Sequence, residues 1–355
     1  MEDISIALRS FIPSQEVADA ILRGLKENRH ESVVDEVSKA DCCEAIITTM
    51  IQTPRTEHDV TCSLLAHKIL SMACEDENAV ITIANSNHLP ALISYLIHNI
   101  LTREVTNKMQ PLFLTILVNL SRHEAFTNHL VSNTNIRSLF KVICEWAQNP
   151  SSSLRPGCIY FLTNCFALKS LSIDIVIELA KEVQAKGLAR QISDELRGGV
   201  TSTPLTPLLR NIFLHLKGTT GTSTELLTIC CELVLQFLPA LVIDRTCQEW
   251  TDEGKRGLRP EEREALSREL IEVLDKSMYV PVVEAPHGDL ADCILLLCNI
   301  PSGEERLKSI AIYPLLRELH LTVVDLLGDT SHVADALLTA IEGLLADYAP
   351  ADCPD

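Results

Sequence analysis

The sequence LVNLSRHEAFTNHLVSNTNIRSLFKVI, which starts at Leu117, holds the pattern that decides the fold. An apolar, helix-like run ends in Asn and Ser, a stretch of mixed polar residues follows, and a second apolar helix then begins. The same order recurs in ILSMACEDENAVITIANSNHLPALISYLI from Ile69, FLTNCFALKSLSIDIVIELAKEV from Phe161 and LLCNIPSGEERLKSIAIYPLLREL from Leu296. A unit of this size that recurs along a chain is typical of stacked helices, which offer surface rather than enclose a reaction.

The composition of the chain favours helices throughout. Hydrophobic residues make up 46% of the 355 residues but aromatic residues only 4%, so the core is expected to be aliphatic. Glycine is scarce, with 13 residues, and few stretches alternate apolar and polar side chains as half-buried strands do. The sequence therefore predicts an all-α fold.

The net charge of the chain limits the classes of partner that it is expected to bind. The formal net charge is −18, and affinity for nucleic acid comes largely from lysine and arginine displacing counterions from phosphates. Direct binding to DNA or RNA is therefore not expected. An acidic surface suits a basic or amphipathic protein partner, although the same charge can simply keep an apolar-rich chain soluble.

The 13 cysteines indicate the compartment. Most of them lie inside apolar helical runs, no Cys-x-x-Cys occurs, and the first residues, MEDISIALRS, lack the basic start of a secretory leader. They are expected to be reduced thiols of a cytoplasmic protein, with the nucleus as the alternative. The apolar run LPALISYLIHNIL is shorter than the roughly 18 residues that span a bilayer, so no membrane contact is expected.

The apolar periodicity predicts where the helices lie. They are expected at residues 14–28, 41–52, 60–73, 77–85, 89–101, 107–121, 124–131, 136–148, 154–168, 173–186, 189–197, 205–217, 223–239, 261–277, 289–300, 304–327 and 331–347. Two prolines punctuate YVPVVEAPHG, which is predicted to be extended.

The predicted organisation is a single repeat domain over residues 1–355. It comprises capping helices at 1–55, core repeats at 56–240, an irregular charged insertion at 241–288, further repeats at 289–348 and a tail at 349–355. Whether residues 240–290 belong to the stack or hang from it is left open.

Residues 61–168 and 289–327 resemble armadillo repeats, with HEAT repeats as near relatives. The helix-ending Asn-Leu-Ala of that family is matched by Ser71-Met72-Ala73, Asn119-Leu120-Ser121, Asn164-Cys165-Phe166 and Asn299-Ile300-Pro301. The spacing of the first three is close to the family's period of roughly 40–47 residues. His88-Leu89-Pro90-Ala91-Leu92 matches the start of the helix that follows the turn. The resemblance implies a right-handed superhelical solenoid whose concave groove binds partners.

The resemblance also indicates candidate binding residues. In the family, the repeated Asn faces the groove and bonds the backbone of an extended peptide. The groove candidates in this chain are Asn119, Arg122, Tyr160, Asn164, Lys169 and Asn299. Alternatively, each Asn caps its own helix, and Arg122 and Lys169 neutralise helix ends.

An importin-like role is not expected, because the family's groove Trp is absent. The four corresponding positions hold His67, Thr115, Tyr160 and Leu295, of which only Tyr160 resembles Trp in size and shape. The charged loop at 245–263 contains Trp250, a second candidate for partner binding. The loop is alternatively a solvated insertion.

The function predicted from these features is a non-catalytic scaffold or adaptor that binds basic or extended peptide segments of a protein partner. The alternative is a regulator of a small GTPase, or a chaperone cofactor, built on the same repeats. A third hypothesis, an enzyme, would require a deep pocket with converging His, Cys and carboxylates.

The sequence contains no phosphate-binding loop and no HExxH, so no cofactor and no metal are expected. A nucleophilic Cys–His pair would need the two side chains to lie close together in the folded chain, which the sequence does not show.

Overall fold

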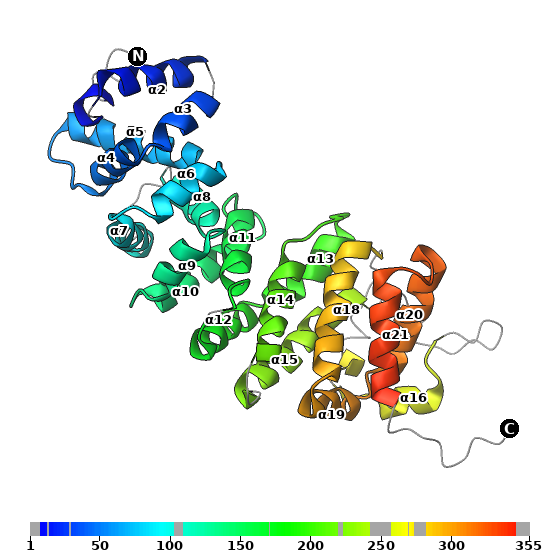
Figure 1. Cartoon of the computed structure of the whole chain (residues 1–355). Helices are drawn as coiled ribbons and strands as arrows, with labels where there is room; N and C mark the ends of the chain where they lie inside the picture. The colour runs from blue at the N-terminus through cyan, green and yellow to red at the C-terminus, as the bar shows by residue number, and fades with distance from the viewer. Residues whose placement is uncertain are drawn as a thin grey trace. The chain divides into compact units, whose positions relative to one another are not determined.

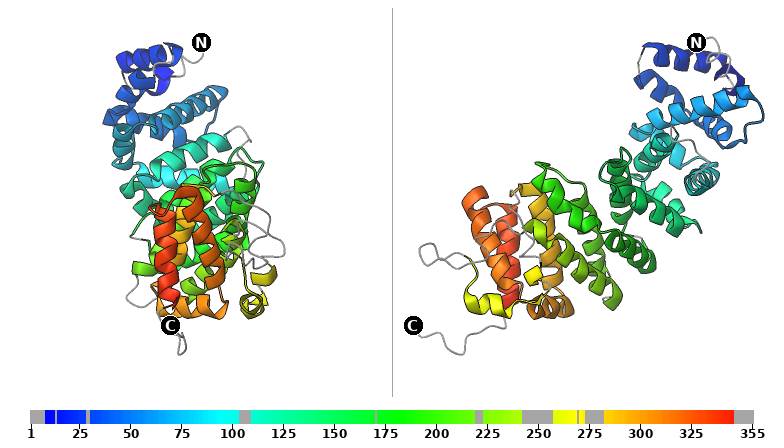
Figure 2. Two further views of the ribbon diagram at one scale, coloured as in Figure 1. Left: turned by 90° about the vertical axis from the view of Figure 1, so that its right-hand side faces the viewer. Right: turned by 180° about the vertical axis from the view of Figure 1, so that it is seen from behind.

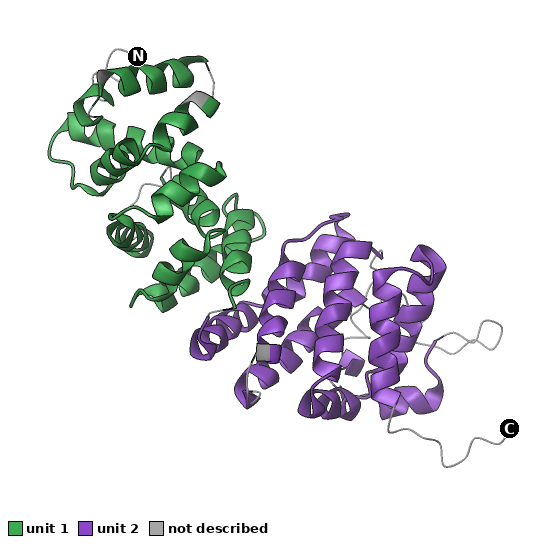
Figure 3. Cartoon of the chain, in the orientation of Figure 1, with its two compact units in different colours: residues 1–170 green, residues 171–355 purple. Residues whose placement is uncertain are grey.

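A computed structural model describes residues 8–12, 14–27, 30–102, 109–169, 171–218, 223–241, 257–268, 270–272 and 282–345. The described residues form helices and no strand, which confirms the all-α prediction (Figure 1). The chain divides into two compact units, residues 1–170 and 171–355, coloured separately in Figure 3. Each unit is a stack of helices, which two further views also show (Figure 2). The superhelical path of the whole chain and the single repeat domain stay predictions.

Unit 1 contains ten helices with assigned bounds. They are α2 (Gln15–Glu27), α3 (His30–Val37), α4 (Ala40–Ile51), α5 (Glu57–Ala73), α6 (Glu77–Ala84), α7 (Leu89–Thr102), α8 (Gln110–Leu120), α9 (Glu124–Val131), α10 (Ile136–Gln148) and α11 (Arg155–Phe166) among the described residues. Helices α5, α8 and α11 pack side by side in one layer, and α4, α7 and α10 form a second layer. The core between the layers is mostly aliphatic, as the composition predicts.

Local sequence signals fix where these helices begin. Thr56 and Asp59 form a capping box at the start of α5, and the carboxylate of Asp76 accepts hydrogen bonds from the first turn of α6. Such bonds satisfy backbone N–H groups that have no partner inside the helix. Pro111 and Pro156 lie in the first turns of α8 and α11, where a missing N–H costs nothing.

Unit 2 contains a second stack. Its described elements are α12 (Ile173–Ala185), η1 (Leu188–Arg190), α13 (Gln191–Arg197), α14 (Leu205–Leu214), η2 (His215–Gly218), α15 (Thr224–Leu241), α16 (Pro260–Ala265), α18 (Glu284–Cys298), α19 (Pro301–Ser309), α20 (Tyr313–Leu327) and α21 (His332–Leu345). Helices α14, α18 and α21 pack in sequence, and α15 packs against α12, α13 and α18.

Helix α15 is a long apolar helix. With 18 residues and a mean hydropathy of 1.5, it meets the length and composition of a membrane span, which the sequence was not expected to contain. The bent pair of α6 and α7 meets the same test only if it is counted as one broken span. The side chains of α15 that face α12, α13 and α18 are buried inside unit 2, and this packing accounts for its apolar character.

Part of the charged loop predicted at 245–263 is bonded to helix α20 within unit 2. Arg317 on α20 forms ion pairs with Glu262 on α16 at 2.5 Å and with Glu318 at 2.9 Å. The Glu318 carboxylate also accepts a hydrogen bond from the backbone N–H of Gly257 at 2.8 Å, and Arg317 donates to the Gly257 carbonyl at 2.9 Å. Gly257 and Glu262 are therefore bonded to α20 and Leu258 is buried, while Arg259, Pro260 and Glu261 between them are exposed.

The structure differs from the predicted helices at four places. The predicted helix 261–277 is interrupted at Leu266 and Ser267, because α16 ends at Ala265. Helix α3 was not predicted, because HESVVDEV is short and weakly apolar. The YVPVVEAPHG stretch was predicted to be extended, but α18 starts at Glu284 and accommodates Pro286 in its first turn. The predicted helix 304–327 is two helices, separated where Ala311 takes a left-handed backbone conformation with φ 55°.

Candidate functional site

Helices α5, α8 and α11 expose one side of their layer in unit 1. On α5, Val60 is 55% exposed and Leu64 is 40% exposed, although both are large apolar residues. On α11, Tyr160 is 53% exposed. We define the α5–α8–α11 face by residues of these three helices and of the turn after α8. It comprises Val60, Leu64, Lys68, Thr115, Asn119, Arg122, Tyr160 and Asn164. Exposed large apolar side chains on neighbouring elements are typical of interaction surfaces.

Asn164 links two helices of this face. Its side-chain amide donates to the carbonyl of Val118 at 3.1 Å and to the hydroxyl of Ser121 at 3.0 Å, both at the C-terminal end of α8. The Val118 carbonyl lies in the last turn of α8, where it also accepts a hydrogen bond from the Ser121 hydroxyl at 2.8 Å. Asn164 therefore caps the neighbouring helix, an arrangement that neither sequence interpretation of this residue anticipated.

Replacing Asn164 with alanine is expected to lower the free energy of unfolding by about 1–2 kcal/mol, because two hydrogen bonds between α8 and α11 are lost. Asn119→Ala is the matched control, since the Asn119 side chain makes no hydrogen bond within the described part of the chain. Urea denaturation of both variants measures the difference. Equal losses in the two variants would show that the α8–α11 link is not stabilising.

Asn119 and Arg122 lie beside a small polar cavity of about 230 Å³. The cavity lies between the turn that follows α5 and the turn that follows α8. Glu75, Asp76 and Glu77 form an acidic wall of this cavity. His123 also lines it, and the Nδ1 atom of His123 is buried without a hydrogen-bond partner in the described structure. A polar ligand group that reached this cavity would find both a cation and carboxylates.

The remaining predicted residues have different surroundings. The Asn299 amide donates to the carbonyl of Leu295 at 2.9 Å on its own helix, which agrees with the capping interpretation. Lys169 is exposed just beyond α11. Trp250 lies outside the described residues, so its prediction stays open. Trp146 is half-buried on α10.

The four positions aligned with the family's Trp are not equivalent in the structure. His67 is buried on α5, where its Nδ1 atom lies 2.6 Å from the carbonyl of Ser63 and its Nε2 atom lies 3.1 Å from the Tyr95 hydroxyl. Tyr160 is exposed, whereas Thr115 and Leu295 are half-buried. Burial lowers the pKa of His67 to about 4, so the ring is neutral near pH 7. His67 is thus a core residue and Tyr160 a surface residue.

A polar cluster that sequence reasoning missed joins α14, α18 and α21 in unit 2. Arg210 on α14 donates to Asp292 on α18 at 2.7 Å, and the other oxygen of Asp292 lies 3.1 Å from His332 on α21. The hydroxyl of Thr206 donates to Asp289 at 2.9 Å, and burial raises the pKa of Asp289. The signal available in the sequence was the pair of aspartates three residues apart on one helical face.

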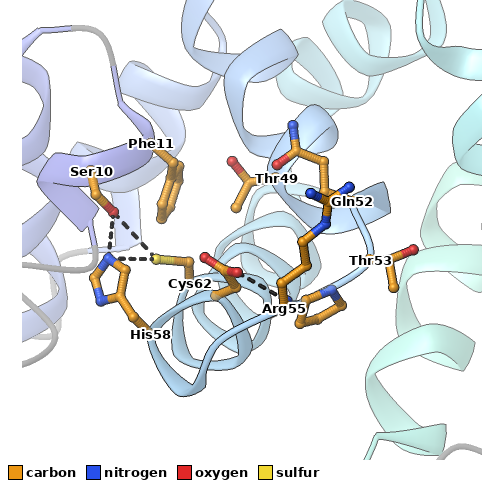
Figure 4. Close-up of a pocket in the computed structure, with 10 residues that line it drawn as sticks. Ser10, Phe11, Thr49, Gln52, Thr53, Arg55, His58 and Cys62 are labelled. Atoms are coloured by element: carbon orange, nitrogen blue, oxygen red, sulfur yellow. Dashed lines mark hydrogen bonds between the residues drawn. The ribbon is translucent and has the colours of Figure 1, made fainter.

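A second missed cluster combines a thiol, an imidazole and a hydroxyl in unit 1. The Cys62 sulfur lies 3.5 Å from His58 Nε2, and the Ser10 hydroxyl lies 3.0 Å from the same nitrogen and 3.3 Å from the sulfur (Figure 4). His58 and Cys62 are four residues apart on α5, which places them on one side of the helix. The sequence HDVTC therefore did contain the proximity signal that a Cys–His pair requires.

No group of three or more His, Cys, Asp and Glu residues within the described ranges is placed to hold a metal ion. The predictions of no metal and no cofactor are not tested by this finding. The cysteines in the described ranges form no disulfide, and all of them are buried.

Comparisons with known proteins give a coarse similarity only. No protein-family model matches the chain, and no curated protein matches it. Among solved structures, the chain is similar to one described as "A conserved phosphorylation switch controls the interaction between cadherin and beta-catenin in vitro and in vivo". The identity is 13%, the match covers 96% of this chain and 86% of that chain, and the TM-score is 0.31. The layered architecture therefore rests on the helix packing described above.

Proposed function

We propose that this protein is a non-catalytic scaffold that binds a protein partner along the α5–α8–α11 face. The observation that carries the proposal is the exposure of Val60 and Leu64 on α5 and of Tyr160 on α11, two helices that both pack against α8 in one layer. A stack of helices presents such side chains at fixed spacing, which suits a partner that lies across several helices. Tyrosine supplies contact area at a low entropic cost, so Tyr160 is the proposed anchor.

The proposed partner carries a basic or extended segment. The chain has a net charge of −18, and the acidic wall of Glu75, Asp76 and Glu77 lies beside Asn119 at the edge of the face. Charges at the rim of an interface mainly raise the association rate and select partners, while apolar anchors supply most of the affinity. Increasing salt should therefore slow association with such a partner more than it speeds dissociation.

The proposal is tested by affinity capture from a lysate of the source organism, followed by binding measurements with each purified captured protein. Tyr160→Ala is expected to weaken binding by about 1–2 kcal/mol, or roughly five- to thirtyfold in Kd. Leu326→Ala is the matched control, because Leu326 is 59% exposed but lies on α20 in unit 2. A captured partner that binds the Tyr160→Ala variant with unchanged affinity would place the site elsewhere.

The regulator hypothesis stays a prediction alongside the scaffold. It requires that the purified chain accelerate nucleotide release from a small GTPase or a chaperone ATPase. A passive scaffold has no effect on nucleotide release. A regulator that acts through this face accelerates release as the wild type and loses that effect as the Tyr160→Ala variant.

A further inference from the structure

The Ser10, His58 and Cys62 side chains meet at the wall of an open cavity in unit 1 (Figure 4). Ser10 comes from residues 8–11, near the start of the described chain, whereas His58 and Cys62 are on α5. The three side-chain atoms lie 3.0–3.5 Å apart, so a proton can pass between the thiol and the imidazole nitrogen. An imidazole in this position is the usual base that converts a cysteine thiol into its nucleophilic thiolate.

The cavity beside this cluster is large enough for a small ligand. Its volume is about 640 Å³, and most of its walls come from polar side chains. Its lining includes Arg55 and Asp59 as well as Ser10, His58 and Cys62. Pockets for peptide-sized and drug-sized ligands usually enclose roughly 300–1,000 Å³. Cys62 is only 5% exposed, but it is part of the cavity wall, so a ligand in the cavity would contact it.

Arg55 gives the cavity wall a group that can bind a carboxylate, beside Asp59. Asp59 is engaged at the start of α5, where its carboxylate accepts hydrogen bonds from the backbone N–H groups of Arg55 and Thr56. These bonds stabilise the ionised carboxylate and so lower the pKa of Asp59. The exposed guanidinium of Arg55 can pair with a carboxylate in two parallel hydrogen bonds, which a neutral ligand cannot supply.

Other thiols of unit 1 lie in less reactive surroundings. Burial raises the pKa of Cys42 and of Cys43 to about 12 each, and both side chains are on α4. Burial also raises the pKa of Cys74, again beyond the usual range of a thiol. Because the thiolate is the nucleophile, these three cysteines are expected to react slowly.

We propose that Cys62 is a modification site at which the thiol exchanges with a low-molecular-weight disulfide that bears carboxylates, of the glutathione disulfide class. The mixed disulfide would occupy the cavity with a carboxylate against Arg55. This inference does not depend on the scaffold proposal, because the cavity lies near the start of α5 and the site needs no protein partner.

The exchange balances in atoms and electrons. The Cys62 thiol gives its proton to His58 Nε2, and the resulting thiolate attacks one sulfur of the disulfide. The bond between the two ligand sulfurs breaks as the new S–S bond forms. The released thiolate takes up the proton from His58 and leaves as a thiol. Cys62 is oxidised to the mixed disulfide, and half of the incoming disulfide is reduced.

The full-length chain tests the proposal when it is incubated with glutathione disulfide, quenched at intervals and mapped cysteine by cysteine by mass spectrometry. Cys62 is expected to be modified at least about tenfold faster than Cys42 and Cys43, which serve as internal controls. His58→Gln keeps a polar side chain but removes the base, and it should slow the reaction of Cys62 by about tenfold or more. Circular dichroism of each variant verifies that the helices are intact.

A second comparison tests the ligand class. Arg55→Gln should slow the reaction with glutathione disulfide several-fold but leave the reaction with uncharged hydroxyethyl disulfide unchanged. Equal rates for Cys62, Cys42 and Cys43 would overturn the proposal, as would an unaltered rate in a folded His58→Gln variant. An equal effect of Arg55→Gln on both disulfides would overturn the proposed carboxylate contact.

Discussion

Arg317→Met is expected to lower the free energy of unfolding of unit 2 by about 3–5 kcal/mol, because it leaves a buried carboxylate without its cation. Glu318 is only 3% exposed, and its carboxylate bonds Arg317 and the backbone of Gly257. Burial alone would raise the pKa of Glu262, but the hydrogen bond and the charge of Arg317 lower it. The guanidinium therefore stabilises both carboxylates and holds Gly257 and Glu262 on α20.

The control for Arg317 is a surface ion pair in the same part of the chain. Arg268 is 91% exposed and forms a pair with Glu272 at 3.4 Å. Arg268→Met is expected to change the free energy of unfolding by less than about 0.5 kcal/mol, as is usual for exposed pairs. Urea denaturation, followed by circular dichroism, measures both variants.

A double variant separates the loss of charge from the loss of packing. In Arg317→Met/Glu318→Gln, the neutral amide can still accept the hydrogen bond from Gly257. Only the Glu262 carboxylate, which keeps its bond from the Arg259 N–H, is left without Arg317. We expect this variant to recover part of the stability lost in Arg317→Met. If the double variant is no more stable than Arg317→Met, the unpaired Glu318 carboxylate is not the cause of the loss.

The helices of this protein could be predicted from its sequence wherever apolar periodicity and caps agree. Helices α9 and α10 were predicted with the bounds that the structure has, because Ser132 to Asn135 supply a polar break between two strongly periodic runs. The helix start at Glu284 could not be predicted from the two prolines alone. A proline ends a helix only where its ring meets a preceding turn, and in α18 no helical turn precedes Pro286.

The candidate sites were predictable only where they depend on one helix. The Asn299 cap is a contact within α18, and a capping interpretation was available from its sequence. The bond of Asn164 to α8 depends on how closely two helices pack, which no local pattern encodes. The Arg210–Asp292–His332 cluster likewise draws on three helices. His58 and Cys62 could have been recognised from their spacing, whereas the approach of Ser10 could not.

Acidification is expected to destabilise unit 1 through His67, by about 3 kcal/mol in total between pH 6.5 and pH 4. The pKa of His67 is lowered from 6.5 to about 4, mainly because burial disfavours the imidazolium. Within this window the unfolded chain binds a proton that the folded chain does not bind. The stabilising contribution is therefore complete above pH 6.5 and is lost progressively as the pH falls toward 4.

His67→Phe provides the comparison that isolates this effect. Phenylalanine can retain the ring packing against Phe113, whose centroid lies 5.1 Å from that of His67, but it does not titrate. The variant is expected to lose the hydrogen bonds to Ser63 and Tyr95, and with them some stability at every pH. The informative quantity is thus the change in the free energy of unfolding between pH 7 and pH 5, which should be about 2 kcal/mol smaller in the variant.

An NMR titration of the folded chain checks the same prediction directly, with the His67 resonance assigned by its absence in His67→Phe. The resonance should not shift until the pH falls well below 6. A titration midpoint near 6.5 would mean that water reaches the ring, and the buried contact with Tyr95 would then be wrong. Equal pH dependence of stability in the wild type and the variant would assign the acid sensitivity to groups other than His67. In unit 2, the corresponding group is His287 on α18, whose pKa is also lowered by burial.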